Sequence, residues 1–100
     1  MLDSIEILSF LQENKEVFRN KYGIRKIGLF GSYARGEQTD QSDVDILIDM
    51  SLDTENIFDK RLQLKDTLMH HFLKNVDVCH DRAIKPAFKD LILKDAIYAW

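Results

Sequence analysis

Two short patterns at a fixed separation constrain this chain more than any other feature. Gly31 and Ser32 open a turn of small residues, and after ten further residues Asp43 and Asp45 form an Asp-x-Asp pair. A glycine turn lets backbone N–H groups approach a phosphate closely. Residues two apart in a strand project from one face, so the two carboxylates would repel each other unless a cation lay between them. Mg²⁺ is the expected cation because it takes oxygen ligands from carboxylates and substrate phosphates.

The residues around these patterns indicate where they lie in a fold. An apolar run over 26–30 precedes the glycine and indicates a buried strand, and a second apolar run over 46–48 follows the carboxylates. The turn therefore leaves the end of one strand, and the carboxylates lie at the start of the next. The sequence predicts that phosphate and metal groups meet at one edge of a sheet.

Hydrophobic periodicity predicts one small α/β (α+β) domain over residues 1–100, with a mixed sheet and helices over one face. Asp3 or Ser4 is expected to cap the first helix, Gly23 to end it, Thr54 to cap the long helix and Pro86 to begin the last one. The expected helices cover 4–22, 55–73 and 87–97, with a helical turn over 34–37, and the expected strands cover 24–30, 44–49 and 76–79.

The spacing of Gly31-Ser32 and Asp43-Val44-Asp45 resembles the signature of the polymerase-beta-like nucleotidyltransferase superfamily. The whole stretch from Gly31 to Asp49 resembles its small members, the minimal nucleotidyltransferase (MNT) domains. That family has a third carboxylate on a later strand, and Asp77 is the candidate. The resemblance implies that Asp43, Asp45 and Asp77 bind two Mg²⁺ ions, and that Gly31 and Ser32 hold the outer phosphates of ATP.

The resemblance also implies a reaction and a partner. The reaction is the transfer of AMP from ATP to a hydroxyl group. Small MNT proteins are commonly paired with a helical HEPN ribonuclease toxin, which implies an antitoxin that adenylylates a toxin tyrosine within a hetero-oligomer. Two other functions stay open. The chain could neutralise its partner by binding alone, or it could modify a small molecule, which would need an acceptor domain that 100 residues leave no room for.

Each element of the pattern has a structural alternative. Gly-Ser pairs are common in ordinary turns, and an Asp-x-Asp pair can be a solvated strand edge. A calcium-binding EF-hand loop that began at Asp40 would need glycine and glutamate where the chain has Asp45 and Ser51. A phosphatase-type Asp-x-Asp-x-Thr motif would need threonine in place of Leu47. Taken alone, Asp77 fits an edge residue as well as a metal ligand.

Other reactive side chains carry weaker signals. Arg35 fits a phosphate contact and an ion pair with a nearby acid equally well. His70 and His71 are adjacent, so on a helix they point in different directions and cannot form a metal-binding pair, and His80 stands alone. Cys79 has no paired base and is expected to pack rather than react.

Composition narrows the class of protein. The net charge of −3 argues against a broad basic surface for nucleic acid, and no apolar run approaches the length of a membrane span. The single cysteine cannot form an internal disulfide, so a reduced, cytoplasmic setting is expected. The apolar end Ile97–Trp100 predicts a docking contact, with Trp100 as an aromatic anchor for a partner.

Overall fold

A mixed four-stranded sheet organises the chain. The computed structural model describes all of residues 1–100. The strands are β1 (Ile24–Phe30), β2 (Val44–Met50), β3 (Val76–His80) and β4 (Ile97–Tyr98), in the spatial order β3-β2-β1-β4. β1 runs antiparallel to β2 and β4, whereas β2 and β3 are parallel. The predicted mixed sheet and α+β class are therefore confirmed, and each predicted strand lies within one residue of its observed bounds.

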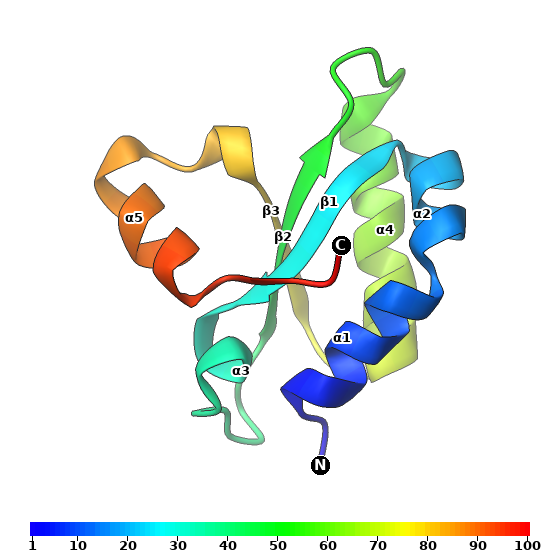
Figure 1. Cartoon of the computed structure of the whole chain (residues 1–100). Coiled ribbons are helices and arrows are strands. Elements are labelled where there is room, and N and C mark those ends of the chain that lie inside the picture. Colours follow the sequence, from blue (N-terminus) through cyan, green and yellow to red (C-terminus); the bar gives the residue numbers. More distant parts are fainter.

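Helices lie on both sides of this sheet. Figure 1 shows α1 (Ser4–Glu13), α2 (Lys15–Tyr22) and α4 (Ile57–Phe72) on one side, and α5 (Pro86–Asp95) on the other. The expectation that all helices cover one face was wrong. β3 and β4 occupy opposite edges of the sheet, so the chain between them has to cross a face, and one face is already filled by helices. None of the helices is both long and apolar enough to cross a membrane.

The main core lies between the sheet and the layer of α1, α2 and α4. Alternate residues of β2 from Val44 to Met50 belong to it, as period-2 alternation requires. Ile7, Leu11 and Leu64 pack against them from the helices. Leu47 has the opposite parity and is fully buried outside this cluster, so it faces the other side of the sheet. That second face is the one on which Asp45 lies.

Two predicted helices have different bounds in the structure. The helix expected over 4–22 breaks at Asn14, whose side chain donates to the carbonyl oxygen of Phe10 (2.9 Å) and ends α1. α4 begins at Ile57 rather than at residue 55, after Asn56 in a left-handed conformation (φ 53°). Thr54 makes no capping contact and lies against Gly23 instead. The first difference therefore comes from a local side-chain contact of Asn14, whereas at α4 the expected cap Thr54 is drawn to a residue remote in the chain.

Only part of the apolar surface of α4 is buried. Phe58 and Leu62, and Leu73 at the end of the helix, are exposed. The residues of α4 that reach the core are Leu64, Leu68 and Phe72. α4 packs against α2 and β3, which selects this stripe, and it leaves Phe58 and Leu62 beside the edge of the sheet.

The C-terminal residues complete the sheet. β4 pairs with Gly28 and Leu29 of β1, and a Cβ atom on Gly28 would lie 2.8 Å from the carbonyl oxygen of Ile97. The indole Nε1 of Trp100 donates to the carbonyl oxygen of Leu11 at 2.9 Å, near the end of α1. That Trp100 anchors a partner stays a prediction; within this chain its indole N–H and part of its ring already contact the core.

This contact predicts a measurable loss of stability. Trp100→Phe is expected to lower the free energy of unfolding by about 1 kcal/mol, because the carbonyl of the buried Leu11 loses its donor. Trp100→Ala, which also removes ring packing, is expected to cost about 2 to 3 kcal/mol. Urea unfolding followed by circular dichroism measures both. A Phe variant as stable as the wild type would show that the hydrogen bond contributes nothing.

Candidate active site

Three carboxylates meet at one corner of the sheet. Asp45 of β2 is in register with Asp77 of β3, next to it on the parallel pair, and Asp43 immediately precedes β2. Val44 and Val76 point into the main core, so Asp45 and Asp77 project from the opposite face. Asp43 and Asp77 are exposed and Asp45 is half-buried. The structure therefore brings together the three acids that the sequence singled out.

Gly31 lies directly against this group. It begins α3 (Gly31–Arg35) in a left-handed conformation with φ +76°. A Cβ atom at this position would overlap Oδ2 of Asp45 and lie 3.0 Å from its Cγ. The helical turn expected over 34–37 begins earlier than predicted, at Gly31, so Gly31 and Ser32 form its first residues. The turn of small residues and the carboxylate pair are thus in van der Waals contact.

The electrostatics of the corner match a cation site. Burial, followed by the charges of Asp77 and Asp43, raises the pKa of Asp45 to about 6, and Arg35 opposes the shift only weakly. The three carboxylates offer only oxygen atoms as metal ligands, and their negative charges repel one another. Mg²⁺ binds to ligand sets of this type. These residues fit a divalent ion together with a phosphate group.

The raised pKa predicts how stability depends on pH. The folded state holds the Asp45 proton more tightly than the unfolded chain, so stability falls as pH rises from about 4 to about 6. Asp45→Asn removes this penalty. The variant is expected to be more stable than the wild type by about 1 to 2 kcal/mol at pH 7.5 without divalent ions, allowing for partial exposure, and equal to it at pH 3.5. Thermal unfolding at both pH values measures the difference, and an equal gain at both would contradict it.

Arg35 is held by two acids. Its guanidinium donates to Glu37 at 3.1 Å and to Asp95 of α5 at 3.0 Å. Hydrogen bonds to Glu37 and then to Asp95 raise the pKa of Arg35. Of the two interpretations that the sequence left open, the ion pair is the one observed in this structure. It ties the end of α5 to α3 beside the three carboxylates.

A second polar cluster lies at the other end of β2 and β3. Potential metal-binding atoms of Asp49, His80 and Asp81 lie within 4.8 Å of one another. Arg25 already donates to Asp49 at 2.7 Å, and Arg82 approaches the same carboxylate at 3.9 Å. These arginines supply the positive charge that the cluster needs. This cluster was not predicted from the sequence, because Arg25 and Arg82 are far from Asp49 along the chain.

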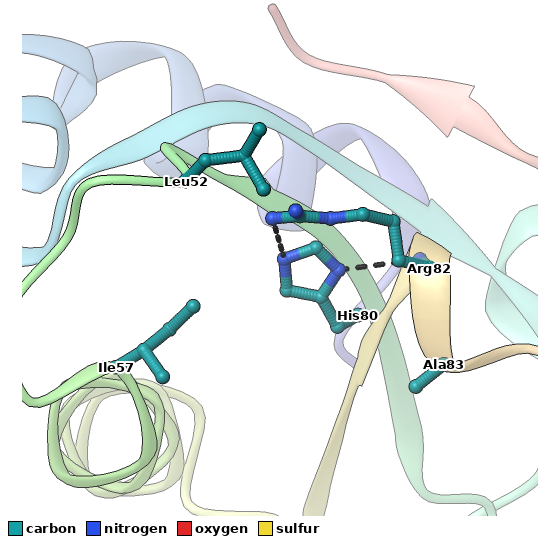
Figure 2. Close-up of a pocket in the computed structure, with 5 residues that line it drawn as sticks. All are labelled: Leu52, Ile57, His80, Arg82 and Ala83. Carbon is teal, nitrogen blue, oxygen red and sulfur yellow. Dashed lines mark hydrogen bonds between the residues drawn. The ribbon is translucent and has the colours of Figure 1, made fainter.

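His80 belongs to the framework of that cluster. Its Nε2 accepts from the backbone N–H of Met50 (3.1 Å) and lies 3.1 Å from the guanidinium of Arg82, as Figure 2 shows for the arginine. Burial and the charge of Arg82 lower the pKa of His80. His71 instead stacks on the ring of Phe10, with centroids 3.6 Å apart. These contacts give His80 and His71 roles in packing and hydrogen bonding within the chain.

Comparison with known proteins identifies the fold and the class of enzyme. The family model described as polymerase beta, nucleotidyltransferase matches residues 12–98. The chain belongs to this family. The matched region contains β1, α3, β2 and β3, the elements that build the three-carboxylate corner.

The relatives of this nucleotidyltransferase cover nearly its whole length. The protein adenylyltransferase MntA of Thermococcus cleftensis is 35% identical over 98 residues, which is 98% of this chain and 97% of the relative. A Methanocaldococcus jannaschii protein assigned as a protein adenylyltransferase is 37% identical over 94 residues, 93% of this chain and 94% of its own. The nucleotidyltransferase is therefore similar to enzymes named for AMP transfer to proteins.

Solved structures share its fold. A protein assigned as a minimal nucleotidyltransferase superposes with a TM-score of 0.76 at 27% identity, over 96% of this chain and 95% of the other. A chain from a toxin–antitoxin structure with AMP-PNP superposes with a TM-score of 0.69 at 25% identity, over 99% of this nucleotidyltransferase and 73% of that chain. The resemblance to MNT domains is therefore confirmed in three dimensions.

Proposed function

We propose that this nucleotidyltransferase transfers AMP from ATP to a hydroxyl group of a partner protein, and that residues 1–100 act as one catalytic domain. The observation that carries the proposal is the contact between Gly31 and Asp45, with Asp77 alongside in register. A phosphate-binding turn and three metal-binding acids have to touch if they are to act on one triphosphate. The AMP-PNP in a structurally similar toxin–antitoxin complex supports ATP as the nucleotide.

Each residue of the corner has a proposed role in the reaction. Gly31 and Ser32 hold the outer phosphates through backbone N–H groups and the Ser32 hydroxyl. Asp43, Asp45 and Asp77 would hold two Mg²⁺ ions, which would neutralise phosphate charge and lower the pKa of the attacking hydroxyl. The hydroxyl oxygen bonds to the α-phosphorus as the bond from the α- to the β-phosphate breaks, and pyrophosphate leaves. Asp77 is exposed, so an acceptor hydroxyl can reach it and pass it a proton.

Arg35 is the remaining proposed phosphate ligand. Arg35 belongs to the same short helix as Gly31 and Ser32, which supports a role close to the outer phosphates. To bind phosphate it has to leave Glu37 or Asp95, and both of these pairs are at least partly open to solvent. Exposed ion pairs contribute little to stability, so the exchange costs little.

The proposed acceptor is a tyrosine of a helical HEPN toxin, with this chain as the antitoxin of a hetero-oligomer. Support comes from the 35% identity to a protein adenylyltransferase, MntA, and from the toxin–antitoxin context of a structural neighbour. We place the pair in the cytoplasm, because Cys79 is a free thiol. Neutralisation by binding alone is the second candidate function. Retention of all three acids at one corner favours the enzyme, because a binding protein has no use for them.

Calorimetry with ATP tests the site itself. Binding is expected with Mg²⁺ present and to weaken by about tenfold or more in EDTA, because the triphosphate then meets three uncompensated acids. Equal affinity with and without the metal would rule out the proposed ligand set. An ATP analogue with a methylene bridge between the α- and β-phosphates serves as the control in the same titration, because the bond that AMP transfer breaks cannot be cleaved in it.

A further inference from the structure

We infer that the groove between α4 and the edge strand β3 binds the segment of the acceptor protein that carries the target hydroxyl. The inference rests on the proposed function. The segment is expected to present apolar side chains to the far end of the groove and acidic side chains close to the hydroxyl. The groove leads to Asp77, so a segment lying in it delivers its hydroxyl to the third carboxylate.

Three adjoining cavities form this groove. The first, of about 300 Å³, is lined by Leu52, Ile57, His80, Arg82 and Ala83, and Figure 2 shows these side chains around the opening. The second, of about 240 Å³, shares Ile57, His80 and Ala83 with the first. The third, of about 140 Å³, shares Arg61 with the second and includes Asp77. Shared lining residues make the groove continuous from the loop after β2 to the carboxylate corner.

The groove has an apolar wall with no cover in this chain. Leu52 is 78% exposed, Phe58 61% and Leu62 42%. Phe58 and Leu62 lie one turn apart on α4 and are not among its buried residues. Isolated exposed apolar residues are ordinary, but a row of them along a groove marks a contact site.

The charge of the groove selects the chemistry of its occupant. Arg61 and Lys65 line its end at Asp77, and Arg82, which is paired with Asp49, lines the other end, whereas the chain as a whole carries a net charge of −3. Arg61 lies over the ring of Phe58 (5.3 Å) and donates one N–H to the Val78 carbonyl oxygen (3.4 Å), which leaves its other donors free. Lys65 makes no ion pair and no hydrogen bond. A segment with carboxylate side chains would complement these cations.

The edge of the sheet adds a backbone surface. β3 is an edge strand, so one side of it has no strand partner. The Val78 carbonyl, which accepts from Arg61, is turned away from β2 and towards the groove. Strand edges of this type pair with extended segments of other proteins. The groove therefore offers apolar, ionic and backbone contacts along one line that ends at Asp77.

Two groove variants and a matched control test the inference. Phe58→Ala and Lys65→Gln are each expected to raise the KM for the HEPN-type partner, and the Kd of its complex, by about tenfold. Leu91→Ala removes a comparably exposed residue (66%) from α5 on the other side of the sheet, and is expected to leave both constants unchanged. The affinity for Mg²⁺–ATP, measured by calorimetry, is expected to stay within about twofold of wild type in all three variants.

The outcomes separate the possible occupants. Unchanged partner constants in the groove variants, or a large effect of Leu91→Ala instead, would overturn the groove assignment. A loss of ATP affinity in Lys65→Gln with an unchanged partner Kd would show that the cation serves the triphosphate, which also overturns it. A wild-type protein that binds the partner without modifying it would contradict the proposed function, while the partner Kd of Phe58→Ala would still decide the groove.

Discussion

Replacing Asp43 and Asp45 together by asparagine is expected to lower the rate of AMP transfer by about a thousandfold or more and to leave the fold intact. Each asparagine keeps the shape of the side chain but removes a negative charge that a divalent ion needs. Loss of a residue that only supports a metal ligand commonly costs about ten- to a hundredfold, and loss of a ligand is expected to cost at least as much. Asp45 is half-buried among like charges, so the folded protein is expected to be no less stable.

Transfer of label from ATP carrying ³²P at the α-phosphate measures this effect, with unfolding in urea as the control for folding. A variant that transfers label at close to the wild-type rate would show that the two carboxylates do not hold the metal. A variant that is inactive because it is unfolded would be recognised by its lost circular dichroism signal. The transfer rates of the two single variants then show which of the two acids contributes more to activity.

Gly31→Ala is expected to reduce transfer by about a hundredfold or more, the second-largest effect. The added methyl group would collide with the Asp45 carboxylate, and the left-handed backbone at φ +76° disfavours any side chain. The turn and the acid therefore cannot keep their contact. The free energy of unfolding is expected to fall as well, by about 1 to 2 kcal/mol.

Gly36→Ala is the matched control for this substitution. Gly36 ends α3 with φ +70°, but a Cβ atom there meets nothing within 4 Å. It carries the same backbone penalty without the collision, so it is expected to lose stability and keep most of its activity. Equal losses of activity in the two variants would show that backbone strain, rather than the contact with Asp45, causes the effect.

The strands and the three-carboxylate corner could be predicted from sequence because their signals are local. β1 and β2 are apolar runs, and the spacing from Gly31 to Asp45 places a turn and an acid on neighbouring strands. The register of Asp45 with Asp77 follows once β2 and β3 are parallel neighbours. The third carboxylate, Asp77, was predicted from the resemblance to the family. The residues around it in the sequence would not have identified it as a metal ligand.

The features that were missed depend on partners remote in the chain. Arg35 is paired by Asp95, sixty residues away, and Trp100 by the carbonyl of Leu11. The side of α4 that faces the core is chosen by packing on α2 and β3, because its apolar residues cover more than one side. The two residues of β4 are too short a run to distinguish from the end of a helix by periodicity.

Intact-mass measurement of the partner tests the central claim most directly. The chain is co-expressed with its HEPN-type partner or incubated with it and Mg²⁺–ATP, and the partner is then weighed and mapped. The account predicts a mass gain of whole AMP units on a tyrosine, absent with the Asp43→Asn, Asp45→Asn double variant. An unmodified partner that the double variant still neutralises would contradict it and would identify the chain as an antitoxin that acts by binding alone.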